Sequence, residues 1–349
     1  MADLDGDGDL DLVLANESDP NDTSRANLVR YENVGTATAP AFELADADWL
    51  GLAYDYGAYA PAFGDLDGDG DLDLLVGGFN GRFALLRNTG AGFEREDDRF
   101  QNVDVGQYAR GALGDLDGDG DLDLIGGASS GRIRVYRNTG TASAPTFGTE
   151  GNGVPVAADA AFQAQIGIPD RIGADTAPAL GDLDGDGDLD LVLGTAEGAL
   201  LVYQNTGSAT APQFTASEPI PAGRRRTTPA LGDLDGDGRP EIVAGSAAGG
   251  FLFWQAAGGT WREPAPGTDL GLRVVPNPST GAVAFRADAD GEVVVFDATG
   301  RRVTRVMLAG GVGTWDGRGT DGQPAASGVY LAQLRAAGGA EAVPFTRLH

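Results

Sequence analysis

The sequence contains no cysteine and no lysine, so arginine alone supplies its 24 strongly basic residues. Without cysteine there is neither a disulfide nor thiol chemistry. The single histidine is His349, the last residue, which leaves no Ser-His-Asp, Cys-His or histidine–metal arrangement. No run of about 18 apolar residues is present, so no transmembrane helix is predicted. We therefore expect that the chain is not an enzyme, although a carboxylate pair for glycoside hydrolysis stays open.

One acidic motif occurs five times. Its second copy, residues 65–73, places aspartates at positions 1, 3, 5, 7 and 9 and a glycine at position 6. An EF-hand loop, which surrounds a Ca²⁺ ion, also begins with acidic ligands at positions 1, 3 and 5 and a glycine at position 6. The ending differs, because the last acid is at position 9 and residues 72–76 form an apolar run typical of a strand. The motif therefore predicts a Ca²⁺ loop between two strands.

The alternative is that Asp-Gly runs only form turns. A turn needs one or two such residues, whereas five carboxylates within nine residues repel one another unless a cation or protons compensate. The fifth copy has Arg239 at position 7 and Glu241 at position 9. This fits a position 7 that contributes only its backbone carbonyl, with its side chain free to vary. About five Ca²⁺ sites are therefore predicted.

The predicted side-chain ligands of these sites are Asp3, Asp5, Asp7, Asp11, Asp65, Asp67, Asp69, Asp73, Asp115, Asp117, Asp119, Asp123, Asp182, Asp184, Asp186, Asp190, Asp233, Asp235, Asp237 and Glu241. The predicted backbone-carbonyl ligands are Asp9, Asp71, Asp121, Asp188 and Arg239.

The formal charge of −28 arises largely from these loops, which hold 24 of the 52 acidic residues. Five bound Ca²⁺ ions would bring it to −18. This charge still repels nucleic acid and anionic membrane surfaces, so neither is an expected partner.

The five motifs begin at residues 3, 65, 115, 182 and 233, a spacing of 50 to 67 residues that indicates a repeat architecture. Each full repeat reads as a small-residue strand, the loop, an aliphatic strand, an alternating strand that ends in Asn-Thr-Gly in three copies, and a short last segment. Four-stranded units of this period favour a β-propeller. Because the first loop begins at residue 3 and no signal peptide precedes it, we expect a truncated N-terminus with any export signal upstream.

These repeats resemble the FG-GAP and VCBS repeats of bacterial surface proteins and, more distantly, the integrin α-subunit propeller. The resemblance covers residues 1 to about 260 and rests on the D-x-D-x-D-G-x-x-D loop between two strands. It implies an all-β, Ca²⁺-stabilised β-propeller, often of seven blades. Five loops are visible, so the propeller is either cut short or closes with five.

A composition rich in Gly, Pro and Ala near residue 260 predicts a boundary, with domains at 1–262 and 271–349 and a linker at 263–270. Residues 271–349 read as a small antiparallel β-sandwich. The motifs P-N-P-x-x-G, D-x-x-G-R and W-D-G-R followed by S-G-V-Y resemble type IX secretion sorting domains and, more closely, the immunoglobulin-like domain of flagellar hook-capping proteins. The resemblance implies a sorting or anchoring domain served by the secretion machinery. A plain spacer domain is the alternative.

Three functions remain open on the sequence. The first is a secreted or cell-surface Ca²⁺-binding propeller for adhesion or protein interaction. The second is a lectin-like propeller, which the non-repeating aromatics disfavour, and the third is an accessory module of a secreted enzyme. Aromatic residues of the two longest connections could contact a protein or glycan ligand, or could cap the cores of the repeats. They are Trp49, Tyr54, Tyr56, Tyr59 and Phe162.

Overall fold

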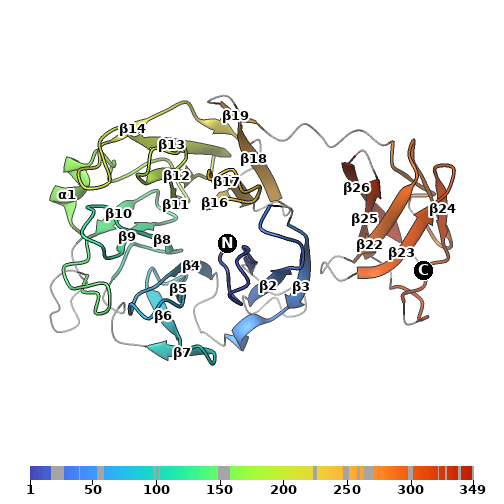
Figure 1. Cartoon of the computed structure of the whole chain (residues 1–349), viewed down its shortest axis with the longest axis horizontal. Coiled ribbons are helices and arrows are strands. Elements are labelled where there is room, and N and C mark those ends of the chain that lie inside the picture. Colours follow the sequence, from blue (N-terminus) through green and yellow to red (C-terminus); the bar gives the residue numbers. More distant parts are fainter. Residues whose placement is uncertain are drawn as a thin grey trace. The chain divides into compact units, whose positions relative to one another are not determined.

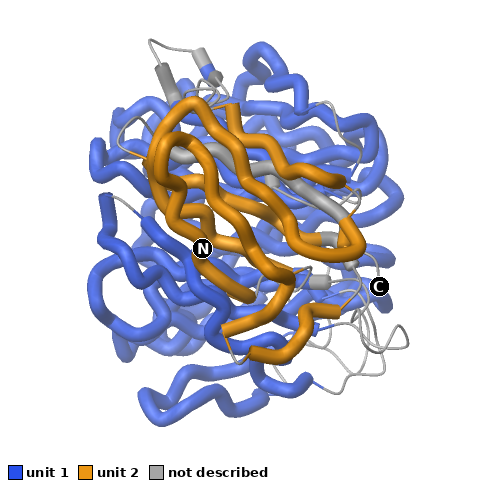
Figure 2. The backbone as a smooth tube through the Cα atoms, turned by 90° about the vertical axis from the view of Figure 1, so that its right-hand side faces the viewer, with its two compact units in different colours: residues 1–261 blue, residues 262–349 orange. Residues whose placement is uncertain are grey.

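A computed structural model of the chain describes most of its residues. The described residues are 1–16, 27–38, 40–52, 59–96, 100, 103–147, 158–222, 226–246, 251–257, 260–262, 271–277, 279–297, 302–320, 322–326, 328–336 and 339–347. The chain folds into two compact units, unit 1 at Met1–Trp261 and unit 2 at Arg262–His349 (Figure 2). The predicted linker at 263–270 lies outside the described residues.

Unit 1 consists of small antiparallel sheets, one for each acidic loop (Figure 1). The first contains β1 (Leu12–Asn16), β2 (Asn27–Asn33) and β3 (Phe42–Asp46), and the second β4 (Ala60–Gly64), β5 (Asp73–Gly77), β6 (Phe83–Asn88) and β7 (Phe93–Glu96). The third contains β8 (Arg110–Gly114), β9 (Asp123–Gly127) and β10 (Ile133–Tyr136). The fourth contains β11 (Ala177–Gly181), β12 (Asp190–Gly194), β13 (Ala199–Asn205), β14 (Phe214–Ala216) and β15 (Ile220–Pro221). The fifth contains β16 (Thr227–Gly232), β17 (Glu241–Ser246), β18 (Phe251–Ala257) and β19 (Thr260–Arg262).

The composition of each strand matches its place in the sheet. In the second repeat, β4 enters the acidic loop and pairs with β5, which leaves it and whose five residues are all buried. A strand buried on both faces needs a continuous apolar run, as Leu74, Leu75 and Val76 supply. The next strand, β6, pairs Leu86 with Leu74 and places Arg87 one residue further on. The predicted order of strands is therefore present in the structure.

Each sheet packs against the next. The strands that enter the loops contact one another in the order β4, β8, β11 and β16, and β1 contacts β4 (Figure 1). Four apolar cores lie between successive sheets, from the first pair to the fourth and fifth. Gly232, the last residue of β16, lies against the first repeat, because a Cβ atom added to it would be 2.6 Å from Leu10 Cδ1 in the first acidic loop.

Three equivalent residues tie the later sheets together. Tyr108, Asp175 and Arg226 each precede the entering strand of their repeat, and each has a positive φ, between 52° and 58°. The Arg226 guanidinium lies 5.7 Å from the centre of the Tyr108 ring, and its Nε lies 3.4 Å from Asp175 Oδ2. Phe79 of the second repeat, 42% exposed, packs edge-on against Tyr108. One mixed aromatic and charged cluster therefore links repeats two to five.

The described helices are short, in keeping with the predicted all-β class. The 3-10 turn η1 is Trp49–Gly51, and α1 is Ala160–Gln165, capped by Asp159, whose side chain accepts the Phe162 N–H. The helix α1 was not predicted, because one capped turn leaves no helical periodicity to detect. No helix in the described part of the chain is long and apolar enough to cross a membrane.

The described aromatic residues of the long connections pack in or beside the apolar cores. Trp49 packs edge-on against Phe93, Tyr59 donates its hydroxyl hydrogen to Leu52 O, and Phe162 is buried between the third and fourth sheets. Tyr54 and Tyr56 lie outside the described residues.

Unit 2 contains two antiparallel sheets on one apolar core. One sheet consists of β20 (Arg273–Val275), β21 (Val283–Arg286) and β24 (Val312–Trp315). The other consists of β22 (Gly291–Phe296), β23 (Arg302–Leu308), β25 (Gly328–Ala336) and β26 (Gly339–Arg347). Trp315 and Tyr330, one from each sheet, form an edge-to-face pair in the core. Buried Arg347 lies 5.4 Å from the Trp315 ring and donates to Gly281 O and Ala325 O.

Close approach of neighbouring sheets generates the first prediction. A Cβ atom at Gly194, which ends β12, would overlap the carbonyl oxygen of Thr227 in the fifth sheet. We expect Gly194→Ala to destabilise unit 1 by about 2 to 4 kcal/mol, because a backbone oxygen cannot move aside without separating two sheets. Gly281→Ala is the matched control, since its Cβ would meet no atom within 4 Å. Urea unfolding measures both, and equal midpoints for the two variants would contradict this packing.

Candidate metal centres

Each acidic loop has the same backbone shape. The glycines at positions 4 and 6 have φ angles of 73–82° and 88–96° in all five copies. Residues other than glycine adopt this left-handed backbone region only at a cost in free energy, so the spacing of the glycines determines where the chain can turn. The turn brings both glycine N–H groups toward the aspartate at position 1.

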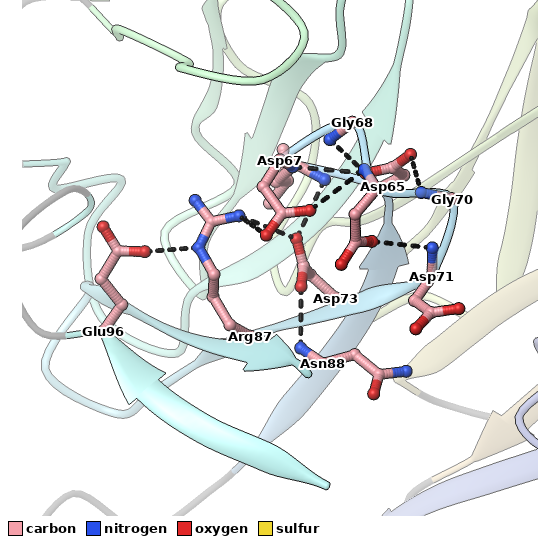
Figure 3. Close-up of polar contacts among 11 residues, drawn as sticks. Asp65, Asp67, Gly68, Gly70, Asp71, Asp73, Arg87, Asn88 and Glu96 are labelled. Atoms are coloured by element: carbon pink, nitrogen blue, oxygen red, sulfur yellow. Dashed lines mark hydrogen bonds and ion pairs between the residues drawn. The ribbon is translucent and has the colours of Figure 1, made fainter. Parts of the chain in front are cut away.

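The carboxylates at positions 1 and 5 accept hydrogen bonds from the loop itself. In the second loop, Asp65 accepts from Gly68 N at 2.6 Å and from Gly70 N at 3.0 Å (Figure 3). Asp69 accepts from Asp71 N at 2.9 Å. The other four loops have the same bonds between the same positions. These contacts hold the backbone in a ring around the acidic side chains.

The acid at position 9 joins the loop to its sheet. Asp73, fully buried, accepts from Leu66 N in the loop at 3.0 Å and from Asn88 N at the end of β6 at 2.8 Å. Asp123 and Asp190 make the same two bonds, and Glu241 accepts from Leu234 N at 2.7 Å. In the first loop, Asp11 accepts from Asn33 N.

Burial raises the pKa of the position-9 carboxyl groups in the second to fifth loops. The pKa of Asp123 is raised to about 7 and that of Asp190 to about 6 by desolvation, and their backbone hydrogen bonds only partly oppose this. The pKa values of Asp73 and Glu241 are raised for the same reason. At position 7, burial and the neighbouring Asp119 raise the pKa of Asp121 to about 6. Charged carboxylates are therefore unfavourable here without a compensating cation.

The structure brings positions 1, 3 and 9 together in four loops. One carboxylate oxygen from each of the three residues lies within 4.8 Å of the others. These groups are Asp65, Asp67 and Asp73; Asp115, Asp117 and Asp123; Asp182, Asp184 and Asp190; and Asp233, Asp235 and Glu241. In the first loop the group is instead Asp3, Asp5 and Asp7, from positions 1, 3 and 5. Asp11, the other position-5 acids (Asp69, Asp119, Asp186 and Asp237) and the position-7 residues lie outside these groups.

Three of the aspartates at position 7 have buried side chains, whereas the sequence suggested that the side chain at this position is free to vary. Asp9, Asp121 and Asp188 are only 7 to 8% exposed, and the Oδ1 atom of each is buried without a hydrogen-bond partner. Asp71 and Arg239 are exposed at the same position. A buried carboxylate oxygen without a donor requires a compensating interaction. Clustered oxygen ligands and orphaned buried oxygens fit a hard divalent cation such as Ca²⁺.

Sequence reasoning missed the side chain that faces position 3. Arg87 Nη1 lies 2.6 Å from Asp67 Oδ2 and 3.5 Å from Asp73 Oδ2, while its Nε donates to Glu96 Oε2 (Figure 3). Arg137 forms the same ion pair with Asp117 at 3.4 Å. In the fourth and fifth repeats Gln204 and Gln255 donate to Asp184 and Asp235. In the second, third and fourth repeats this side chain belongs to the residue directly before Asn-Thr-Gly, and that position was the signal available in the sequence.

The asparagine of that motif forms a turn. Asn205 Oδ1 accepts from Gly207 N at 3.0 Å and Gln213 N at 2.8 Å, and Asn138 makes equivalent bonds. The turn also covers the loop of the preceding repeat, because Ser143 Cβ would lie 3.2 Å from a Cβ at Gly68. Thr210 covers Gly118, and Thr38 of the first repeat covers Gly236 of the fifth.

The raised pKa values generate a prediction for the metal-free protein. In the folded chain Asp121, Asp123 and Asp190 release their protons near pH 6 to 7, but in the unfolded chain near pH 4. Between these values the folded state binds more protons, so its stability is greatest near pH 4 and falls as the pH rises to about 7. In chelator, we expect unit 1 to lose on the order of 1 kcal/mol per pH unit for each of these three groups over this window.

Thermal unfolding in chelator at pH 5, 6 and 7 measures this slope. Asp123→Asn should flatten the slope even where it lowers the absolute stability, because the amide does not titrate. Stability that increases from pH 5 to 7 in chelator would show that these carboxyl groups are not the controlling ones.

The solved structures that this chain matches are distant from it in sequence. PorZ, described as an essential bacterial surface component of the type IX secretion system of Porphyromonas gingivalis, is 12% identical with a TM-score of 0.25, and the alignment covers 92% of this chain and 58% of PorZ. A triple arginine-to-alanine mutant of AofleA from Arthrobotrys oligospora is 12% identical with a TM-score of 0.40 and coverages of 84% and 90%. Raptor from Chaetomium thermophilum is 12% identical with a TM-score of 0.31 and coverages of 97% and 28%.

The chain spans little more than half of PorZ and less than a third of Raptor. No curated protein sequence matches it.

The acidic repeats themselves match a sequence family. The model of the FG-GAP-like repeat matches residues 3–76, 65–126, 115–193 and 182–244. Each match begins at position 1 of one acidic loop and extends past the next, so the matched unit contains the carboxylate groups described above. Because the matches together run from residue 3 to residue 244, which is more than half of the chain, the chain belongs to the FG-GAP-like repeat family.

Proposed function

We propose that unit 1 is a five-bladed β-propeller with a structural Ca²⁺ ion in each acidic loop, and that it acts outside the cell or on its surface as an adhesion or protein-interaction module. The observation that carries the proposal is the recurrence of one carboxylate group per repeat in five consecutive sheets. FG-GAP-like repeats suggest a module for protein interaction or adhesion.

Closure with five blades is supported by the contacts of the terminal repeats. Gly232 and Gly236 of the fifth repeat lie against Leu10 and Thr38 of the first. The same two contacts join successive repeats within the chain, where Gly114 lies against Leu189 and Gly118 against Thr210. In a closed ring, the first and last repeats make the same contacts as any other pair of neighbouring repeats.

The choice of Ca²⁺ is supported by the ligand chemistry. Every candidate ligand is an oxygen atom, which favours Ca²⁺ or Mg²⁺ over the softer transition metals. The ion would supply the positive charge that the loop carboxylates lack, and the chain would hold it through positions 1, 3 and 9. Extracellular Ca²⁺ modules bind at roughly 10⁻⁴ to 10⁻³ M, so an excess of about 10- to 100-fold contributes about 1.4 to 2.7 kcal/mol per site.

An interaction role without catalysis is supported by the surface. His349 is the only histidine, and the clustered acids are accounted for as cation ligands. The exposed Phe79, with Tyr108 and Arg226 beside it, gives the described surface one non-repeating aromatic and charged feature. A lectin-like function would use the same feature, and a glycan array tests it directly. A lectin with one pocket per blade would repeat the feature, which occurs once among the described residues.

We further propose that unit 2 is an immunoglobulin-like sorting or anchoring domain that the type IX secretion machinery recognises. Its motif residues also have packing roles that a spacer domain would share. Trp315 Nε1 donates to Arg318 O, and Tyr330 Oη donates to Ala326 O, each at 2.6 Å. The test is export of a reporter fused to residues 271–349 in a host with and without that machinery.

Removal of the cation tests the central proposal. By differential scanning calorimetry in about 10 mM Ca²⁺ and in excess chelator, we expect the unit 1 transition to fall strongly and the unit 2 transition to stay. Asp182→Asn should remove about one fifth of the Ca²⁺-dependent stabilisation, because Asp182 takes part in one of five carboxylate groups. Glu218→Gln, which removes one exposed charge between β14 and β15, is the matched control. Coincident traces with and without Ca²⁺ would contradict structural metal sites.

A further inference from the structure

We infer that the residue facing position 3 of each loop sets the affinity of that loop for its cation, with arginine acting as a built-in counter-ion and glutamine leaving the charge to the metal. This inference rests on the proposed Ca²⁺ function. It concerns Arg87, Arg137, Gln204 and Gln255, none of which is a ligand.

The chain contains its own comparison. The second, third and fourth loops have the same nine residues, Asp-Leu-Asp-Gly-Asp-Gly-Asp-Leu-Asp. Differences in cation affinity among them must therefore come from outside the loop. In each of these repeats one residue of the third strand pairs with the first leucine after the loop, namely Leu86, Tyr136 and Tyr203 in the second, third and fourth repeats. The residue that follows it is Arg87, Arg137 and Gln204, respectively. One equivalent position thus carries a charge in two loops and none in the third.

The side chains at this position contact the acid that would contact the cation. Arg87 is only 15% exposed, lies 2.6 Å from Asp67, and is held there from its other side by Glu96. Gln204 Nε2 reaches the equivalent Asp184 at 3.5 Å and is fixed by Ser217, whose hydroxyl donates to Gln204 Oε1. Position and donor are therefore preserved, while the positive charge is lost. Arg137 also forms an ion pair with Asp159, and its guanidinium lies over the ring of Phe162. Its distance to Asp117 is 3.4 Å, longer than the 2.6 Å between Arg87 and Asp67.

The first repeat obtains its guanidinium from another residue. Tyr31 pairs with Leu12, so Glu32 occupies the place of Arg87, and Arg30 contacts Asp11 at 2.9 Å and Asp5 at 3.5 Å instead. The fourth loop has a second influence, because Arg239 Nε would lie 3.3 Å from a Cβ at Gly185. The inference therefore concerns exchange of the residue within one loop and not a ranking of the loops by total charge.

A fixed positive charge beside the ligands has opposite effects on the two states of a loop. In the metal-free loop it offsets the repulsion between Asp67 and Asp73, so the loop stays ordered. It also repels an incoming dication and has to give up part of its ion pair when the cation binds. At a separation of several ångströms in a partly buried site, this competition corresponds to about a tenfold change in affinity.

Reciprocal substitutions in the full chain test the inference. Hydrogen exchange measured by mass spectrometry against free Ca²⁺ gives a separate midpoint for peptides over residues 62–76 and 179–193. We expect Arg87→Gln to shift the second-loop midpoint to about tenfold lower Ca²⁺ and to speed metal-free exchange there. Gln204→Arg should do the reverse at the fourth loop. Arg82→Gln, an exposed arginine just before β6 at the end remote from Arg87, removes the same charge and should change neither midpoint.

The two kinds of failure differ. If the wild-type loops respond to Ca²⁺ but Arg87→Gln leaves the midpoint unchanged or raises it, Arg87 only supports the fold and the inference is wrong. If no wild-type peptide responds to Ca²⁺, the proposed metal function fails and the inference fails with it. Opposite shifts in affinity and in metal-free order cannot arise from a purely structural role, which would lower both.

Discussion

Repulsion between carboxylates crowded into each loop is the constraint on which unit 1 depends. Backbone N–H groups neutralise part of it: the two glycines donate to position 1, and the residue at position 7 donates to position 5. These donors fix the shape of the loop, but in four of the five loops they leave the oxygens of positions 1, 3 and 9 close to one another. Orphaned oxygens of Asp9, Asp121 and Asp188 add to the deficit of positive charge. The backbone therefore builds a site that its own donors cannot complete.

The acid at position 9 connects this local problem to the whole sheet. Asp73 accepts from the loop through Leu66 and from the end of β6 through Asn88. An ordered loop therefore also fixes the register of β5 against β6, and disorder in the loop removes one of the two hydrogen-bond donors from a buried carboxylate. Since β5 is buried between neighbouring sheets, loop order and packing between repeats are coupled. This coupling explains how a small charged loop can control the stability of an apolar unit.

The sequence was sufficient for the features that repeat. Motif spacing predicted the loops and the strand before and after each, because these are local consequences of nine residues, whereas the ligand set at positions 1, 3, 5, 7 and 9 stays a prediction. The sequence was insufficient where contacts depend on strand register or on the next repeat. Arg87 is 14 residues from Asp73, and only the pairing of Leu74 with Leu86 brings it to the loop. The burial of position 7 and the packing of Trp49 and Phe162 likewise depend on neighbouring elements that no local pattern encodes.

The fifth repeat shows how contact with a neighbouring repeat can constrain a residue of the acidic loop. In the third, fourth and first repeats the turn after the third strand covers the loop of the preceding repeat through Ser143, Thr210 and Thr38. The fifth repeat has no Asn-Thr-Gly turn, and Arg239, at position 7 of its own loop, lies over Gly185 instead. On the sequence alone, arginine at position 7 looked like a side chain without constraint. In the structure Arg239 lies against the preceding loop, where a turn residue lies in those three repeats, so the neighbouring repeat constrains this side chain.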